Sequence, residues 1–169
     1  MKRTRALLKS AQPASHEEYF KALCLDVADD LDSDKTSVWT FDPGLTLIQC
    51  QCGYDALTQA FSSGQILRRA DYPRYFERIV EDNVVCAPYA QSQAVTAEFV
   101  ESYFRPQGIV SLLDFILHEG MRPYGIICCE NRRGIRHWSP ENQDYLRGIA
   151  SLTSFLFLPR AANGTPRRT

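Results

Sequence analysis

Two β-hairpin patterns constrain the fold of this 169-residue chain more than any other feature. In the first, residues 36–41 are rich in β-branched and aromatic types, Asp42-Pro43-Gly44 supplies a turn, and residues 45–52 return as a second strand. In the second, the apolar run 109–117 turns through a glycine and a proline and pairs with residues 124–130. Hairpins make antiparallel neighbours, so the sequence predicts an antiparallel sheet and not a doubly wound parallel one.

Helix signals flank and separate the two hairpins. Ser15 and Glu18 have the spacing of a capping box and open a helix that is expected to reach Leu31. Ser139, followed by a proline and a glutamate, starts a final helix that is expected to reach Leu158. Four short elements are predicted between them: an edge strand at 65–69, a helix from Pro73, a strand at 83–86 and a helix at 92–104. The predicted fold class is therefore α+β, an α/β sandwich with helices on both faces of the sheet.

The formal net charge of -1 conceals an acidic body between two basic ends. Residues 1–10 carry four basic and no acidic side chains, and residues 159–169 carry three basic and none acidic. The body at 11–158 therefore holds 12 basic against 20 acidic residues, which argues against nucleic acid as its main partner. We expect a mobile basic lead at 1–13, one folded domain at 14–158, and a basic tail or linker at 159–169.

Composition and cysteine usage favour a cytoplasmic location. The chain is 44% hydrophobic and 23% charged, as is usual for a globular domain, and no apolar run approaches the roughly 18 residues of a membrane span. The apolar stretch after the first basic residues is too short for a secretory signal. The six cysteines lie in apolar, mostly strand-like runs, which favours buried reduced thiols over disulfides. We therefore expect no membrane insertion.

Four segments resemble the GAF domain, a small-molecule sensing module of bacterial signalling proteins. The segments are Thr36-Ser37-Val38-Trp39-Thr40-Phe41, Asp71-Tyr72-Pro73-Arg74-Tyr75-Phe76, Gly108-Ile109-Val110-Ser111-Leu112-Leu113-Asp114, and Gly125-Ile126-Ile127-Cys128-Cys129-Glu130 with Arg136-His137-Trp138-Ser139 after it. They follow the order of the family and lie within residues 15–158, most of the chain. The type they resemble is the one found with sensor histidine kinases and diguanylate cyclases.

This resemblance implies both a fold and a class of function. It implies a sheet of five or six strands, with the first and last helices together on one face and a pocket on the other. It also implies a regulatory role, a small-molecule ligand, and a homodimer through the first and last helices. The final helix carries more apolar residues than one buried stripe needs, which independently favours a second contact. The ligand and any cofactor stay unknown, and an output domain or partner protein would receive the signal.

The candidate ligand-binding residues come from these segments and their surroundings. They are Asp71, Tyr72, Arg74, Tyr75, Thr96, Asp114, Cys128 and Glu130. The two tyrosines offer amphipathic aromatic surface beside Arg74, which suits a planar or anionic ligand. Asp114 and Glu130 stand in apolar strands, where a carboxylate is costly unless it is paired, caps a loop or faces a polar cavity. Ligand binding and purely structural hydrogen bonding are both open for this pair.

Cysteine chemistry is an alternative to simple packing. Residues two apart on a strand face the same way, so Cys50 and Cys52 could hold a metal or form a redox pair. Cys128 and Cys129, by contrast, point to opposite faces, and no histidine stands at metal-ligand spacing from these thiols. Buried packing is therefore favoured, and no metal site is predicted. No nucleophile or phosphate loop accompanies the two carboxylates, so no catalytic residue is predicted.

Three functions stay open from the sequence. The favoured one is a non-catalytic sensor that binds a small molecule between the sheet and the helices of residues 71–105 and signals through its terminal helices. The second is a degenerate GAF module that serves only dimerisation or protein docking. The third is an enzyme like the methionine-sulfoxide-reductase GAF proteins, although their characteristic cysteine-bearing loops are missing from this sequence.

Overall fold

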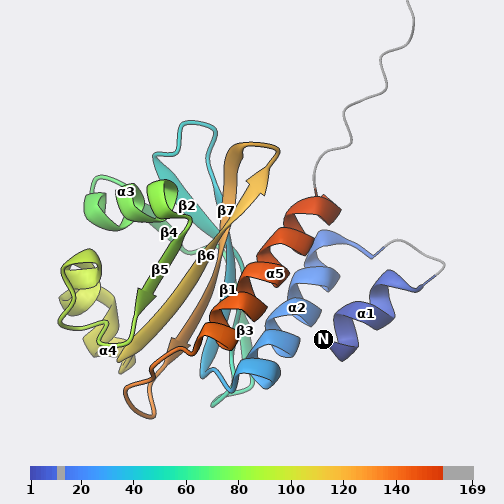
Figure 1. The fold of residues 1–169 in the computed structure, drawn as a ribbon, viewed down its shortest axis with the longest axis horizontal. Coiled ribbons are helices and arrows are strands. Elements are labelled where there is room, and N and C mark those ends of the chain that lie inside the picture. The colour runs from blue at the N-terminus through green and yellow to red at the C-terminus, as the bar shows by residue number, and fades with distance from the viewer. Residues whose placement is uncertain (11–13, 158–169) are drawn as a thin grey trace, which may run out of the picture.

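An antiparallel sheet separates two layers of helices in the computed structural model, which describes residues 1–10 and 14–157 (Figure 1). The strands are β1 (Lys35–Phe41), β2 (Leu47–Asp55), β3 (Ala60–Ser62), β4 (Ile66–Arg68), β5 (Val84–Ala87), β6 (Ser111–Glu119) and β7 (Arg122–Asn131). Their order is β3-β2-β1-β7-β6-β5, and β4 pairs with the other end of β2. The predicted fold class is confirmed, and the three-residue strands β3 and β4 bring the sheet to seven strands.

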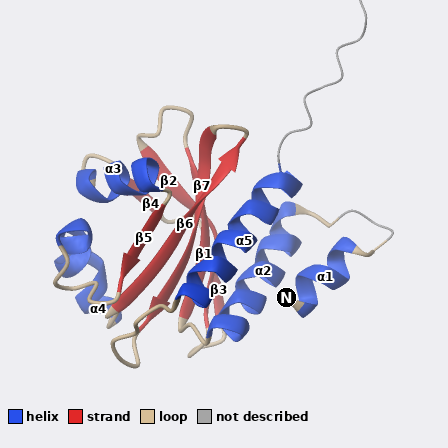
Figure 2. Ribbon diagram, in the orientation of Figure 1, coloured by secondary structure: helices blue, strands red, loops and turns tan. Residues whose placement is uncertain are grey.

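The helices divide between the two faces of the sheet (Figure 2). They are α1 (Lys2–Leu8), α2 (His16–Leu31), α3 (Pro73–Asp82), the 3-10 helix η1 (Ala94–Phe99), the π-helix η2 (Val100–Phe104), α4 (Arg105–Gln107) and α5 (Pro140–Phe157). Helices α1, α2 and α5 lie on one side, and α3 and α4 lie on the other. The single helix predicted over 92–104 is in the structure divided into the 3-10 helix η1 and the π-helix η2. The predicted helix end at Leu158 and the predicted tail at 159–169 lie outside the described residues.

Local sequence signals set several element ends as predicted. The Ser15 hydroxyl accepts a hydrogen bond from the Glu18 N–H, and the Glu18 carboxylate accepts one from the Ser15 N–H at 2.9 Å. This capping box starts α2. In the first hairpin, the Asp42 carboxylate accepts hydrogen bonds from the backbone N–H groups of Thr46 and Leu47, at 2.6 and 2.8 Å. The turn between β1 and β2 is therefore closed by its own aspartate.

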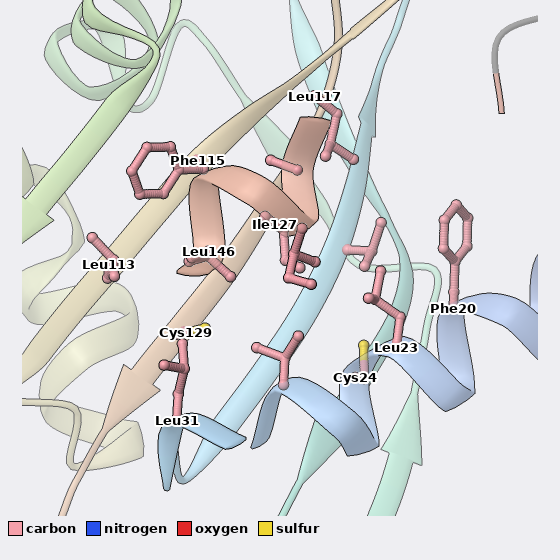
Figure 3. Close-up of a cluster of buried hydrophobic side chains, with 14 of the residues drawn as sticks. Phe20, Leu23, Cys24, Leu31, Leu113, Phe115, Leu117, Ile127, Cys129 and Leu146 are labelled. Atoms are coloured by element: carbon pink, nitrogen blue, oxygen red, sulfur yellow. The ribbon is translucent and has the colours of Figure 1, made fainter. Parts of the chain in front are cut away.

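Each face of the sheet has its own hydrophobic core. On the α2 and α5 side, Leu23, Ile127 and Leu146 are fully buried and pack together (Figure 3). On the other side, Phe76 and Ile79 of α3 belong to a second buried cluster over the sheet. Successive residues of a strand point to opposite faces, so β6 and β7 contribute alternately to both cores. A residue facing the second core therefore has sequence neighbours in contact with the first.

The amino-terminal segment forms a helix, whereas the sequence predicted a mobile lead. Asp26 of α2 is 1% exposed and accepts hydrogen bonds from the Thr4 N–H at 2.8 Å and the Thr4 hydroxyl at 2.7 Å. Burial alone raises the pKa of Asp26, but these donors and the Arg3 N–H lower it overall. N–H groups in the first turn of a helix have no partner within the helix, so α1 docks on this carboxylate. Residues 11–13 lie outside the described part of the chain.

A bulge in β2 separates two cysteines that were predicted to share a face. Val38 pairs with Cys52 and Trp39 pairs with Cys50, so Gln51 is an extra residue on β2. An extra residue shifts the alternation of side chains by one. Cys52 therefore joins the core under α2, whereas Cys50 joins the core on the opposite face. The prediction that these two thiols face the same way is wrong. Because they lie on opposite faces of the sheet, they do not form the metal or redox pair that was considered for them.

Candidate ligand-binding site

A small cavity lies on the second face of the sheet, opposite α2 and α5. Its volume is about 30 Å³, close to the space of a single water molecule. Five aromatic and three aliphatic residues make most of its wall: Trp39, Tyr75, Phe99, Tyr103, Phe104, Ile48, Leu67 and Leu112. The polar lining residues are Asp114, Cys128 and Glu130. The cavity is thus apolar with a few convergent polar groups, which is the composition of small-molecule sites.

Asp114 of β6 is a buried carboxylate with one oxygen unpaired. The Tyr75 hydroxyl of α3 donates a hydrogen bond to its Oδ2 at 2.5 Å. Among the described residues its Oδ1 meets no N–H or O–H donor, only the weak thiol donor of Cys128 is beside the carboxyl, and the residue is only 1% exposed. Burial raises the pKa of Asp114 to about 7, although Cys128 and Tyr75 act in the opposite direction. The group is therefore poised between its neutral and charged forms near neutral pH.

Glu130 of β7 is the second buried acid, and it is connected to the surface through a tyrosine. The Tyr103 hydroxyl donates a hydrogen bond to Glu130 Oε2 at 2.9 Å, and Lys35 Nζ donates one to the Tyr103 oxygen at 3.2 Å. Burial raises the pKa of Glu130, while the charge of Lys35 and the Tyr103 hydrogen bond oppose the rise. A half-buried lysine thus closes a short polar chain that begins inside the cavity.

The two acids stand on one wall of the cavity because of the sheet register. Asp114 lies directly opposite Cys128 in the β6–β7 pair, and Glu130 lies two residues further along β7. Residues two apart on a strand share a face, and such diagonal neighbours lie about 7–8 Å apart. The charge of Glu130 accordingly contributes to the raised pKa of Asp114. The arrangement gives a pair of carboxyl groups beneath an aromatic cover.

A family model described as GAF domain matches residues 15–155. The chain belongs to the GAF domain family. The match covers most of the chain and includes every residue that lines the cavity. A search of the curated proteins finds no match to this sequence.

Solved structures show the same GAF fold at low sequence identity. The phycocyanobilin-bound GAF domain of a cyanobacterial phytochrome is 14% identical, with a TM-score of 0.74 over 92% of this chain and 90% of that one. The GAF domain of an Acinetobacter phosphoenolpyruvate-protein phosphotransferase is 12% identical, with a TM-score of 0.64 over 92% of this chain and 87% of that one. The chromophore-binding domain of Stigmatella aurantiaca bacteriophytochrome is 14% identical, with a TM-score of 0.70 over 92% of this chain. The present chain spans only 57% of that protein's length.

Four of the eight predicted ligand-binding residues line the cavity of this GAF domain. Tyr75, Asp114, Cys128 and Glu130 come from α3, β6 and β7 and meet there. Tyr75 faces inward because Pro73 sets the first turn of α3 and its third residue then points at the sheet. Asp114 and Glu130 thus face a cavity, one of the alternatives expected for them, although most of its wall is apolar.

The other four predicted residues are not among those lining the cavity. Arg74 is exposed, and its Nε lies 3.9 Å from a carboxylate oxygen of Glu98. Asp71 is also exposed, two residues before the start of α3. Tyr72 stacks on Phe99 from outside, with ring centroids 4.1 Å apart. The fully buried Thr96 donates its hydroxyl hydrogen to a backbone carbonyl at 2.7 Å, which is a structural role.

Sequence reasoning missed part of the lining, above all Tyr103 and Trp39. Tyr103 falls within the helix predicted at 92–104, and a buried tyrosine usually has a hydrogen-bond partner for its hydroxyl, which is the signal that could have found it. Trp39 lies on the family-like first strand, in which neighbouring residues are buried on opposite faces, so the sequence did not show which face it takes. Lys35 gave no signal, because its contact with Tyr103 joins residues 68 positions apart.

The described residues offer no arrangement typical of a metal centre. Within 1–10 and 14–157, no group of three or more His, Cys, Asp or Glu side chains could hold a metal ion together. Over the same residues, every helix is too short or too polar to cross a membrane.

Proposed function

We propose that this GAF domain is a non-catalytic sensor that binds a small molecule in the cavity under Tyr75 and Tyr103. The observation that carries the proposal is Oδ1 of Asp114, which lacks an N–H or O–H donor and is buried in a mostly apolar site. A buried acceptor without a donor costs about 1–3 kcal/mol. Packing alone would favour an apolar residue here, whereas a ligand that donates a hydrogen bond would recover this cost.

A regulatory role agrees with the chemistry of the lining groups. Burial raises the pKa of the Cys128 thiol well above its usual range, which keeps it protonated and weakly nucleophilic. One of the structurally similar proteins is named as a phycocyanobilin-bound GAF domain, so a ligand is known to occupy a domain of this fold. We carry over from it only the idea that a small molecule is bound.

The sheet offers a short route from the cavity to the terminal helices. Asp114 faces the cavity, while its neighbours Leu113 and Phe115 belong to the core that β6 shares with α2 and α5. A ligand that prefers one position of β6 therefore prefers one packing of α5 against it. We propose that this shift of population is the signal, passed to an output domain or a partner protein.

We further propose that a second copy of the chain docks on α5. Leu152 and Phe155 are 39% and 75% exposed, and their spacing of three places them on the same helical surface. Large apolar side chains grouped on a surface are typical of an interaction site. A homodimer through the terminal helices would couple the two cavities. We place this dimer in the cytoplasm, where the six unpaired cysteines would stay reduced.

A thermal-shift screen tests the sensor proposal. The probes are nucleotides, cyclic dinucleotides, amino acids and aromatic metabolites, since a molecule that binds only the folded state raises Tm. Leu67 lies half-buried on the edge strand β4 and lines the cavity, so Leu67→Trp would fill it from outside. We expect at least one probe to raise the Tm of the wild type and not of Leu67→Trp. A blank screen combined with a stable dimer would instead favour the module that serves only dimerisation.

A further inference from the structure

We infer that the cavity selects a planar organic cation with N–H donors, such as an amidinium, a guanidinium or a protonated amino-heterocycle. This inference rests on the proposed function and adds the chemical class of the ligand. Of the two kinds of ligand expected beside Arg74, planar or anionic, it keeps the planar one and drops the anionic one, because that side chain is outside the cavity. Three independent features of the described residues support it.

The first feature is the sign of the charges at the cavity. Both ionisable acids of the lining, Asp114 and Glu130, carry negative charge when ionised, and no lysine, arginine or histidine lines the cavity. Lys35 lies outside the lining and reaches the site only through the Tyr103 hydroxyl, from where its charge acts on Glu130 but does not contact Asp114. An anionic ligand would face repulsion in a site of low dielectric constant, whereas a cation would satisfy both acids.

The second feature is the inventory of hydrogen-bonding groups. Asp114 Oδ1 is an acceptor that lacks a donor, and its other oxygen already accepts the Tyr75 hydroxyl. The Cys128 thiol beside it is only a weak donor. A carboxylate can accept two N–H groups held in one plane, which is the geometry of amidinium and guanidinium ions. A ligand that binds the ionised form of Asp114 must therefore bring donors and not acceptors.

The third feature is the aromatic cover of the acids. Trp39, Phe99 and Tyr103 line the same cavity, together with the rings of Tyr75 and Phe104. The faces of aromatic rings attract cations, and the attraction is worth about 0.5–2 kcal/mol. Flat rings also pack well on a planar ligand. Acidic and aromatic walls together favour a cation that is itself flat.

Tyr103 supplies a way in for a ligand larger than the present cavity. It lines both the cavity and an outer groove of about 610 Å³, in which Lys35 also lies. It stands in the π-helix η2, a rare conformation that is frequent at functional sites. Rotation of this one side chain away from Glu130 would join the cavity to the groove, so the groove is the proposed route of access.

Three probes of nearly the same shape test the charge and the donors separately. They are benzamidine, a cation with N–H donors; benzamide, its neutral analogue; and benzoate, its anion. Binding of each to the purified full chain is measured by calorimetric titration and by Tm. We expect benzamidine to bind at least tenfold more tightly than benzamide and benzoate not to bind. Asp114→Asn and Glu130→Gln, which keep the shape of the side chains, should each weaken benzamidine at least tenfold.

Two controls make the outcomes decisive. Asp144→Asn removes an exposed carboxylate on α5 and should leave benzamidine binding unchanged, whereas Leu67→Trp should abolish it. The inference is overturned if benzamidine fails to bind, if benzoate binds as tightly, or if neither acid variant weakens binding. A neutral or anionic molecule that binds the wild type but not Leu67→Trp would overturn the cationic class and leave the sensor proposal standing.

Discussion

The hydroxyl of Tyr75 donates a 2.5 Å hydrogen bond to Oδ2 of Asp114, and this contact ties helix α3 to strand β6 inside the cavity. Both side chains are almost completely buried, at 4% and 1% exposure. The bond satisfies half of a carboxylate that the surrounding apolar residues cannot satisfy. The structural role of the pair and its proposed role in ligand binding are therefore inseparable at this position.

Removal of the Tyr75 hydroxyl should destabilise the domain. In Tyr75→Phe, Asp114 would lose its hydroxyl donor and keep only the weak thiol donor of Cys128, which costs about 1–3 kcal/mol. The loss should be larger at pH 8 than at pH 6, because the ionised carboxylate needs the donor more. Urea denaturation measures the free energy of unfolding at both values. Tyr72→Phe, whose hydroxyl forms an exposed hydrogen bond with Ser102 at 3.3 Å, is the matched control, and equal effects would contradict this account.

The stability of the domain should depend on pH through Asp114. Its pKa is about 7 in the folded chain, because burial disfavours the charge, and about 4 in the unfolded chain. Between about pH 4 and pH 7 the unfolded state binds fewer protons at this group than the folded state does. The stabilising contribution of protonated Asp114 is therefore fully present below about pH 4. It is then lost as the pH rises towards about 7. The free energy of unfolding falls on this account by up to about 1.4 kcal/mol per pH unit.

Asp114→Asn isolates that dependence. We expect the variant to gain stability relative to the wild type as the pH rises from 5 to 7, measured by urea denaturation at each pH. Carboxylates whose pKa is lowered on balance, such as Asp34, change stability at lower pH and in the opposite direction, and they are present in both proteins. Parallel pH profiles for the two proteins would show that Asp114 does not titrate in this range.

The two cysteines separated by the bulge should differ in reactivity. A hydrogen bond with Cys24 and the charge of Lys21 lower the pKa of Cys52 in spite of burial, and Cys52 lines a groove of about 510 Å³. Burial raises the pKa of Cys50 to about 12. Iodoacetamide at pH 8 should therefore label Cys52 at least tenfold faster, as followed by peptide mass spectrometry. Lys21→Met should slow the labelling of Cys52, and equal rates at both cysteines would contradict the prediction.

The proposed dimer depends on the exposed surface of α5. Phe155→Glu should weaken self-association at least tenfold in sedimentation velocity experiments, because it puts a charge into an apolar contact. Met121→Glu changes another exposed apolar side chain, which is 97% exposed in the turn between β6 and β7, and it should leave association unchanged. A monomeric wild type, or a Phe155→Glu variant that associates normally, would refute the dimer.

Much of the fold could be predicted from local sequence signals. The capping box of Ser15 and Glu18, the turn at Asp42 and the proline after Ser139 each act within a few residues, so each can be recognised without tertiary structure. The inward position of Asp114 and Glu130 was likewise foreseeable, because an acid in an apolar strand must find a polar partner or a cavity.

The errors arose where distant residues decide the local structure. The register of β2 against β1 determines which face Cys50 takes, and the bulge at Gln51 leaves no mark in the sequence. Similarly, α1 docks through the bond of Thr4 to Asp26, 22 residues away, and its basic composition suggested only a mobile segment. Arg74 was placed in the site from its neighbours, but the turn of α3 directs it outward.

Equilibrium dialysis against a bacterial metabolite extract tests the central claim most directly. Wild type and Leu67→Trp are dialysed side by side, and the molecules enriched with each protein are identified by mass spectrometry. The account predicts that the wild type retains at least one small molecule, positively charged at neutral pH, that Leu67→Trp does not retain. Identical retention by the two proteins, or no retention by the wild type, would contradict the claim that this cavity is a ligand site.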